Sequence, residues 1–274
     1  MRDGRPGCSL VGEYLACLRD CPFLLVEEKL IMVRKSFSTC APTPASLQIL
    51  YEDNHLIAVN KPAGILVQGD ISGDTSLMDL VRQYIKEKYR KPGNVFLGLI
   101  HRLDRPVSGV MLFARTSKAA SRLSRQWRSR SIRKIYWVLV HGVMTPEKGS
   151  ITSHLKKNGV KGVVIAKEGE QGAQEGILDY RTLQAAAGGS LLEIVLHTGR
   201  KHQIRAQLAA AGCPVMGDVK YGAPYAFENK AIRLMARSLT FTHPTREEEI
   251  IIEAPPPEWV STFLHAGGKR TGRR

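Results

Sequence analysis

Several motifs that define large enzyme classes are missing from this sequence. It contains no G-x-x-x-x-G-K-[ST] loop, no G-x-G-x-x-G after a predicted strand, no H-E-x-x-H and no G-x-S-x-G. Their absence argues against nucleotide hydrolysis, dinucleotide redox chemistry, zinc proteolysis and serine hydrolysis, because each chemistry needs the backbone or side-chain geometry that its motif supplies. His101, His197 and His202 are irregularly spaced. We therefore expect no metal site.

Long apolar runs and cysteines are also scarce. No apolar stretch approaches the roughly 18 residues that span a bilayer, and CPFLLVEEKLIMV near the N-terminus is too short and too acidic for a secretory signal. The five cysteines are an odd number, four of them within the first 40 residues, and they match neither a paired zinc pattern nor a disulfide framework. We expect free thiols in a soluble protein of the cytoplasm.

Acidic side chains are few relative to basic ones. The chain carries 25 Asp and Glu against 40 Lys and Arg, a net charge of +15 at pH 7. Such an excess predicts attraction to polyanions, and nucleic acid is the favoured partner. A membrane surface is the rival, but no amphipathic segment has the large apolar face that interfacial helices need, so we expect no membrane association.

The 274 residues, 43% of them hydrophobic, can bury a substantial core. Residues 1–45 have weak periodicity and end in STCAPTPAS, which predicts a poorly structured or loosely packed extension. Residues 46–265 are expected to form one compact domain, and 266–274 a basic disordered tail. We expect the protein to be a monomer.

Hydrophobic periodicity predicts an α+β fold with a mainly antiparallel mixed sheet flanked by helices. Two strands flank a turn at Glu52–Asn54, and a helix over 75–89 begins with a capping box of Ser76 and Asp79. The polar, Gly-rich stretch 156–176 suits hairpins and an exposed loop. The remaining predicted strands are 109–116, 134–143, 190–198, 233–244 and 248–255, and the remaining helices 117–134, 199–212 and 255–266.

One carboxylate stands alone in a strongly basic region. Asp104 is the only acidic residue from Lys88 to Pro146, while residues 105–146 hold nine Lys and Arg. It lies in a predicted loop before strand 109–116, and the positive surroundings should keep it ionised. It could be a salt bridge that only pins the loop, or a nucleophile or base acting on a sugar carbon. Spacing alone leaves both open.

The helix after Asp104 turns Arg122, Arg125 and Arg128 away from its apolar stripe. These arginines are candidates for contacts to RNA phosphates, and a solvated helix face is the alternative.

Four segments, in order across residues 46–254, resemble the RluA-type RNA pseudouridine synthases. HRLDRPVSGVMLFA is similar to the family's H-R-L-D motif, and YEDNHLIAVNKPAGILV to its early strand pair ending in N-K-P-x-G. RKIYWVLVHG resembles its K-x-Y strand, and TGRKHQIRAQLAAAGCPVMGDVKYG its G-R-x-H-Q-I-R and G-D-x-x-Y-G signature. The resemblance implies the pseudouridine synthase fold with a central active-site cleft.

The same resemblance implies an enzyme that isomerises uridine in ribosomal or transfer RNA. The uracil is detached from C1′ of its ribose, turned and rejoined through C5, without a cofactor or metal. Asp104 would be the essential aspartate, attacking the sugar or assisting glycal formation. Tyr136 would stack on the flipped base and could take the C5 proton, and Arg205 would pair with Asp104. An ordinary core tyrosine and a phosphate-binding arginine are the respective alternatives.

Further residues follow from the motif. Arg102 would fill the space left by the flipped nucleotide, because the reacting atoms cannot be reached inside a stacked helix. Leu103 and Ile204 would wall the base pocket. His101 is expected to be mainly structural beside the substrate, and Lys61 architectural with a possible RNA contact.

Two departures from the family pattern stand out. Pro106-Val107 replaces an acidic residue and a threonine found in many members, and residues 1–45 are too short and too balanced in charge to be expected to form a basic RNA-binding domain of the S4 type. Target recognition would then depend on the catalytic domain. The rival function is a non-catalytic RNA-binding or ribosome-assembly factor. An RNA methyltransferase is disfavoured, because its Gly-rich cofactor loop is missing.

Overall fold

The computed structural model describes residues 43–267 apart from 72, 160–161, 187 and 228. Most of the predicted N-terminal extension and basic tail lie outside these residues. The helices are α3 Leu77–Lys88, α4 Ser117–Arg128, α5 Gln203–Ala210 and α6 Glu258–Gly267, with the short turns η2 Pro44–Ser46 and η3 Val219–Tyr221. The strands are β1 Gln48–Glu52, β2 Leu56–Lys61, β3 Gly98–Leu99, β4 Ser108–Ala114, β5 Arg133–His141, β6 Lys148–Asn158, β7 Gly162–Ala166, β8 Gln174–Ala186, β9 Gly189–Leu196, β10 Leu234–Thr242 and β11 Glu249–Glu253.

The described strands form one mixed sheet of eleven strands. Its order is β1-β2-β4-β10-β5-β9-β8-β6-β7, while β11 pairs with β10 and β3 with β4. The β4–β10 pair is parallel and the other pairs are antiparallel. The predicted α+β class and mainly antiparallel mixed sheet are therefore confirmed. Across the part of the chain that the structure describes, none of the helices is both long and apolar enough to traverse a lipid bilayer.

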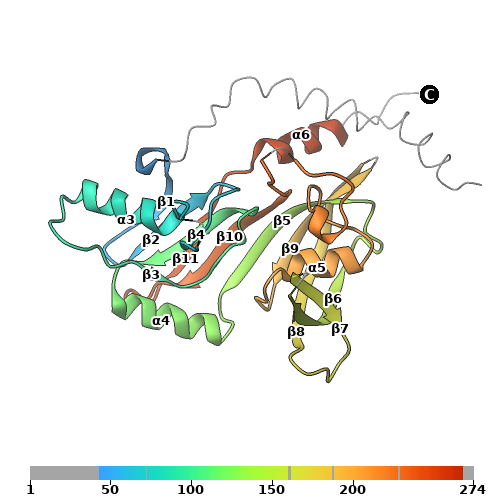
Figure 1. The fold of residues 1–274 in the computed structure, drawn as a ribbon, viewed down its shortest axis with the longest axis horizontal. Coiled ribbons are helices and arrows are strands. Elements are labelled where there is room, and N and C mark those ends of the chain that lie inside the picture. The colour runs from blue at the N-terminus through green and yellow to red at the C-terminus, as the bar shows by residue number, and fades with distance from the viewer. Residues whose placement is uncertain (1–42, 72, 160–161, 187, 228, 268–274) are drawn as a thin grey trace, which may run out of the picture.

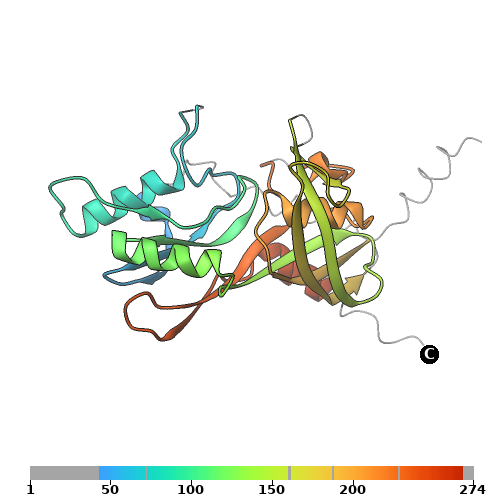
Figure 2. The same ribbon diagram turned by 90° about the horizontal axis from the view of Figure 1, so that it is seen from below.

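The sheet divides into two halves joined by its central strands. Both ribbon views place α3 and α4 with β1, β2 and β4 in one half, and α5 with β6, β7 and β8 in the other (Figure 1 and Figure 2). Strands β5 and β10 run between them. Residues that are far apart in the sequence can therefore meet where the two halves face each other.

Helices cover the N-terminal half because its central strand is apolar on both faces. On β4, Met111 and Phe113 belong to one core cluster with α3, whereas Val110 and Leu112 belong to the other with α4. Such a continuous apolar run is typical of a strand buried on both sides. The loop before β4 is thereby attached to a rigid element.

A glycine fixes how closely β4 approaches β10. Gly109 has a φ of 112°, and a side-chain carbon added there would lie 2.2 Å from the carbonyl oxygen of Ala236. Only glycine combines this left-handed conformation with so close a backbone contact. The parallel pairing of Ser108 with Met235 and Gly109 with Ala236 depends on it, and it sets where the preceding loop emerges.

Most predicted elements are confirmed, including the capping box of Ser76 and Asp79 at the start of α3. The helix predicted over 117–134 was too long, because it ends at Arg128 and Arg130 adopts a positive φ of 57°. Residues 133–134 instead begin β5. The long strands β6 and β8 were not predicted, since their sequences mix polar and apolar residues and only some of their side chains are buried.

Candidate active site

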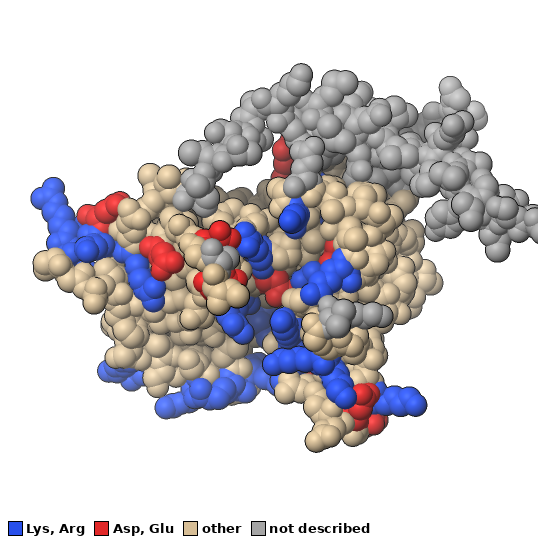
Figure 3. Space-filling model, in the orientation of Figure 1, with Lys and Arg blue, Asp and Glu red and all other residues tan. Residues whose placement is uncertain are grey.

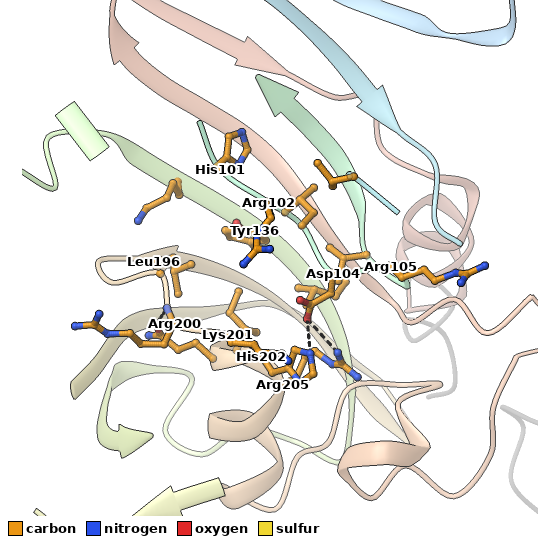
Figure 4. A pocket seen from close by; sticks show the side chains of 18 of the residues that line it. His101, Arg102, Asp104, Arg105, Tyr136, Leu196, Arg200, Lys201, His202 and Arg205 are labelled. Atoms are coloured by element: carbon orange, nitrogen blue, oxygen red, sulfur yellow. Dashed lines mark hydrogen bonds and ion pairs between the residues drawn. The ribbon is translucent and has the colours of Figure 1, made fainter. Parts of the chain in front are cut away.

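A cleft of about 840 Å³ opens where the two halves of the sheet meet. One side is lined by the 66–70 segment and the 100–107 loop, and the other by residues 199–205 at the start of α5; β5 contributes Lys134 and Tyr136. Figure 4 shows side chains from these segments pointing toward a common space. The central cleft predicted from the sequence is therefore present.

The Asp104 carboxylate points across this cleft toward α5 (Figure 4). Its Oδ2 accepts a hydrogen bond of 3.0 Å from Nη1 of Arg205. The Asp104 side chain is 27% exposed, so one part of the carboxylate is held by the protein while another can reach a ligand. The predicted pairing of Asp104 with Arg205 is seen directly in this geometry.

Arg205 is itself oriented by a second carboxylate. Its Nε and Nη2 donate to the two oxygens of Asp218 at 2.7 and 2.8 Å, in a bidentate pair that is almost fully buried. Burial opposes the charge, but the two carboxylates outweigh it and the pKa of Arg205 is raised. A guanidinium can bridge two carboxylates in fixed directions, which an ammonium cannot do.

His202 is a further neighbour of Asp104. Its Nε2 lies 3.5 Å from Oδ2 of Asp104, and its Nδ1 lies 2.8 Å from the hydroxyl of Tyr221. That hydroxyl already accepts the amide proton of Val163, so donating its own proton to Nδ1 satisfies it fully. The proton of a neutral His202 then resides on Nε2, facing Asp104.

Burial keeps His202 neutral, lowering its pKa to about 4 although Asp104 acts in the opposite direction. His202 also has a φ of 52°, a left-handed conformation that is rare for residues other than glycine. Unusual backbone conformations of this kind cluster at functional sites.

Tyr136 lies on the cleft face of β5 (Figure 4). Burial, and secondarily the negative charge of Asp104, raise the pKa of its hydroxyl. Tyr136 is therefore a protonated phenol at neutral pH. Leu103 and Ile204 are buried and contribute apolar lining, and Arg102 is exposed at the cleft.

Lys61 is not part of the cleft lining. It is fully buried, and its Nζ donates to the carbonyl oxygens of Pro62, Arg105 and Val107 at 3.1, 3.1 and 2.7 Å. Burial lowers the pKa of Lys61 to about 7, although Asp104 favours its charged form. The structure therefore places Lys61 beneath the Asp104 loop, as a support that ties the loop to the end of β2.

His101 supports the cleft wall from the other side. Its Nε2 accepts the amide proton of Leu112 at 3.1 Å, and its ring stacks on Trp127 with centroids 4.5 Å apart. Burial lowers the pKa of His101 to about 3, with Lys134 adding to the effect. These contacts agree with a mainly structural residue that also lines the cleft.

The three arginines of α4 do not line the cleft. Arg122 donates to the carbonyl oxygen of Pro244 at 2.5 Å, while Arg125 and Arg128 are exposed. In the space-filling view, Lys and Arg side chains gather on the lower part of the face, on both sides of the boundary between the halves (Figure 3). The cleft has an excess of positive charge as well, because seven Lys and Arg but only two carboxylates are among its described lining residues.

Sequence reasoning assigned no role to four residues that the structure brings to the site. These are Lys134, His202, Asp218 and Tyr221. Their signal was present, because all four lie inside the K-x-Y, G-R-x-H-Q-I-R and G-D-x-x-Y-G segments. What the motifs could not show is which of these side chains touch one another.

The chain is similar in sequence and in fold to known RNA pseudouridine synthases. The family model for RNA pseudouridylate synthase matches residues 55–210. The tRNA pseudouridine synthase C of Pasteurella multocida is 35% identical over 228 residues, covering 76% of this chain and 90% of its own. The ribosomal large subunit pseudouridine synthase D of Neisseria meningitidis serogroup B is 32% identical over 257 residues, covering 87% and 66%. The solved human RNA pseudouridylate synthase domain containing 4 superposes with a TM-score of 0.68 at 25% identity, covering 80% and 92%.

Three observations together define the class of protein. The fold is a mixed sheet, its basic cleft holds an aspartate–arginine pair, and the family model matches residues 55–210. This chain belongs to the RNA pseudouridine synthase family, and within it to the RluA type. It is an isomerase, and its partner is RNA. Nothing in these comparisons favours the non-catalytic RNA-binding alternative.

Proposed function

We propose that this protein converts specific uridines of ribosomal or transfer RNA to pseudouridine, with Asp104 as the essential catalytic residue. The names of its relatives include both a transfer RNA and a ribosomal RNA enzyme, which supports this pair of targets. The observation that carries the proposal is the Asp104 carboxylate, partly exposed in the cleft and held at 3.0 Å by Arg205.

Asp104 is proposed to act at C1′ of the flipped nucleotide, as a nucleophile or in forming a glycal. Arg205 orients it through the 3.0 Å hydrogen bond from Nη1. Tyr136 is proposed to stack on the uracil and to exchange the C5 proton. A tyrosine whose pKa is raised keeps its proton at neutral pH, so Tyr136 can take the C5 proton only after its own proton has passed to another group.

The nucleotide must leave its stack before it can react, which costs a few kcal/mol. We propose that Arg102, exposed at the cleft, occupies the space left behind, and that Leu103 and Ile204 contact the extruded base. His101 holds the wall beside them. Lys61 supports the loop from below, and its complete burial argues for a role without direct RNA contact.

The outer surface is proposed to bind RNA phosphates through α4. Arg125 and Arg128 are exposed and carry this proposal, and Arg122 contributes less because Pro244 already takes one of its donors. We further propose a cytoplasmic monomer whose catalytic domain spans 46–265 with flanking segments 1–45 and 266–274. Light scattering at several concentrations tests the monomer.

Asp104→Asn tests the catalytic proposal. The change removes the negative charge and leaves the basic surface intact, so RNA binding should persist while pseudouridine formation falls below detection. Pseudouridine is measured after chemical derivatisation of the RNA, because the isomerisation does not change its mass. Glu249→Gln, an exposed change on β11, is the control and should leave activity unchanged. Retained pseudouridine formation by purified Asp104→Asn would contradict the proposal.

A further inference from the structure

Lys134 is a largely buried lysine whose amine faces the cleft and has no counterion among the described residues. Its side chain lines the cleft from β5, yet the residue is only 9% exposed. None of the described residues forms a hydrogen bond or an ion pair with its amine. It is the first residue of the K-x-Y segment, and neither the catalytic geometry nor the supports of the Asp104 loop make use of it.

The surroundings of Lys134 make its charge costly. Burial lowers its pKa to about 8, and the nearby guanidinium of Arg130 acts in the same direction. The amine is not among the described side-chain atoms that are both buried and without a partner, so it faces the cleft, where water hydrates it until a ligand with hydrogen-bond acceptors replaces that water. Lys61 differs in this respect. It is 0% exposed beneath the Asp104 loop, and its amine donates to three carbonyl oxygens.

The position of Lys134 relates it to the base pocket. Lys134 and Tyr136 are two residues apart on one strand, so their side chains share a face and lie about 7 Å apart along it. A side-chain carbon added at Gly199 would lie 4.0 Å from Nζ of Lys134, which places the amine opposite the loop that leads to His202. The amine therefore borders the same cleft as Asp104, two residues before Tyr136 on β5.

The charge at this end of the cleft favours an anion. Arg200 and Lys201 line the cleft beside Gly199, and Arg200 uses its Nε on the carbonyl oxygen of Glu175. Aromatic surface is also present, because Trp127 lines the cleft with His101 stacked on it. Cations with aromatic rings are the combination that binds single-stranded nucleic acid.

We propose that Lys134 binds the phosphodiester adjacent to the flipped uridine and so forms a subsite for the neighbouring nucleotide. An uncharged base carbonyl could accept a hydrogen bond from the amine but could not balance its charge, whereas a phosphate does both. The step of about 7 Å from Tyr136 suits a group one nucleotide away from the stacked base. This inference rests on the proposed function, since it takes the nucleotide at Asp104 and Tyr136 as its reference.

The test compares Lys134→Met with wild type in binding pentauridylate. The variant should bind about ten-fold more weakly, and the slope of log affinity against log salt should fall by about 0.7, the value for one phosphate contact on a single strand. Lys134→Arg keeps the charge and should bind within a few-fold of wild type. Lys86→Met, an exposed lysine on α3 outside the cleft lining, is the charge-matched control and should leave binding unchanged.

A second arm changes the RNA instead of the protein. The two phosphates flanking the central uridine are replaced, one at a time, by an uncharged methylphosphonate. Replacing one of them should weaken wild-type binding about ten-fold and leave binding by Lys134→Met almost unchanged. This arm also measures the phosphate contact on wild-type protein, so it tests the inference even if Lys134→Met folds poorly.

Two results would overturn the inference. One is that Lys134→Met binds like Lys86→Met with an unchanged salt slope. The other is that each methylphosphonate weakens the variant as much as wild type, which would assign the amine to the base or to no ligand. Both readouts are binding measurements, so they stay separate from the catalytic proposal, which is judged by pseudouridine formation in ribosomal or transfer RNA.

Discussion

The two ends of the cleft differ in whether their charged side chains have partners within the protein. At the Asp104 end, Asp104 and the buried charges around it have protein partners: Arg205 holds Asp104 and Asp218, and Lys61 donates to three carbonyl oxygens. At the other end, Lys134 is nearly as buried, but no partner for its amine is found among the described residues.

The difference separates two tasks. A reacting group must be held within fractions of an ångström, and protein contacts made before the substrate arrives supply that precision. A binding group must keep its interactions for the ligand, because a cation whose hydrogen bonds are already made within the protein gains little from a phosphate. The predictions below test this division from the largest expected effect to the smallest.

Arg205→Lys should disturb the Asp104 end most. A lysine cannot bridge Asp104 and Asp218 at once, so the catalytic carboxylate loses its fixed orientation. Because a misplacement of about 1 Å can cost about 100-fold in rate, kcat should fall by at least about 100-fold. Single-turnover pseudouridine formation measures it. The control is Arg237→Lys. Arg237 lies on β10, pairs with Glu253 and does not line the cleft. Equal rates for the two variants would contradict the assignment.

Lys61→Met should loosen the support beneath Asp104. Three carbonyl groups lose their donor, and the free energy of unfolding should fall by about 3 kcal/mol. The folded pKa of Lys61 is about 7, below its value in the unfolded chain, so this group's contribution to stability grows from about pH 7 to about pH 10 and is lost as the pH falls through 7.

Urea unfolding across this pH range measures both effects. The gap in stability between wild type and Lys61→Met should therefore widen as the pH rises, whereas Lys86→Met should show no such trend. A gap that stays constant with pH would mean that Lys61 keeps the same charge in the folded and unfolded chain.

Reversing Arg122, Arg125 and Arg128 to Glu tests whether phosphate binding extends beyond the cleft onto α4. RNA affinity should fall about ten-fold and the salt slope should become smaller by about 0.7 to 0.9 for each lost contact. Because Arg122 already donates to Pro244, its single reversal should contribute least to the change in slope. An unchanged slope would assign this helix face to solvent.

Tyr221→Phe has the smallest expected effect and tests a single hydrogen bond at the Asp104 end, the one between Tyr221 and His202. The ring remains near Arg205, but His202 Nδ1 loses its hydroxyl partner, so the proton of His202 is no longer directed to Nε2. A lost hydrogen bond of about 1 kcal/mol predicts a roughly five-fold lower kcat with little change in RNA affinity. Tyr180→Phe, which removes a hydroxyl bonded to Pro146, is the control. Equal kcat values for the two variants would remove His202 from the account.

Elements with one strong period were predictable. The apolar run of β4, the amphipathic pattern of α3 and its capping box follow from local sequence alone. Strands β6 and β8 were missed, because they are only partly buried and their polar residues hide the period of two. The end of α4 was misplaced, since nothing in the sequence SRSIRK marks Arg130 as the residue that turns.

The site was partly predictable in the same way. Asp104 stood out as a lone acid in a basic region, and the family motifs pointed to Arg205 and Tyr136. Asp218 and Tyr221 were visible only as letters of a motif, because the contacts that matter join residues separated by more than ten positions. Lys61 and Lys134 looked alike in sequence, and their different surroundings appear only in the fold.

By itself, the sequence determined the family, the basic character and the strands and helices with clear periodicity, because these depend on local side-chain order and on total charge. The tertiary structure alone decided which cations find partners within the protein. Desolvation and hydrogen bonding act between groups that pack together, and residues far apart along the chain become neighbours only when the two halves of the sheet meet.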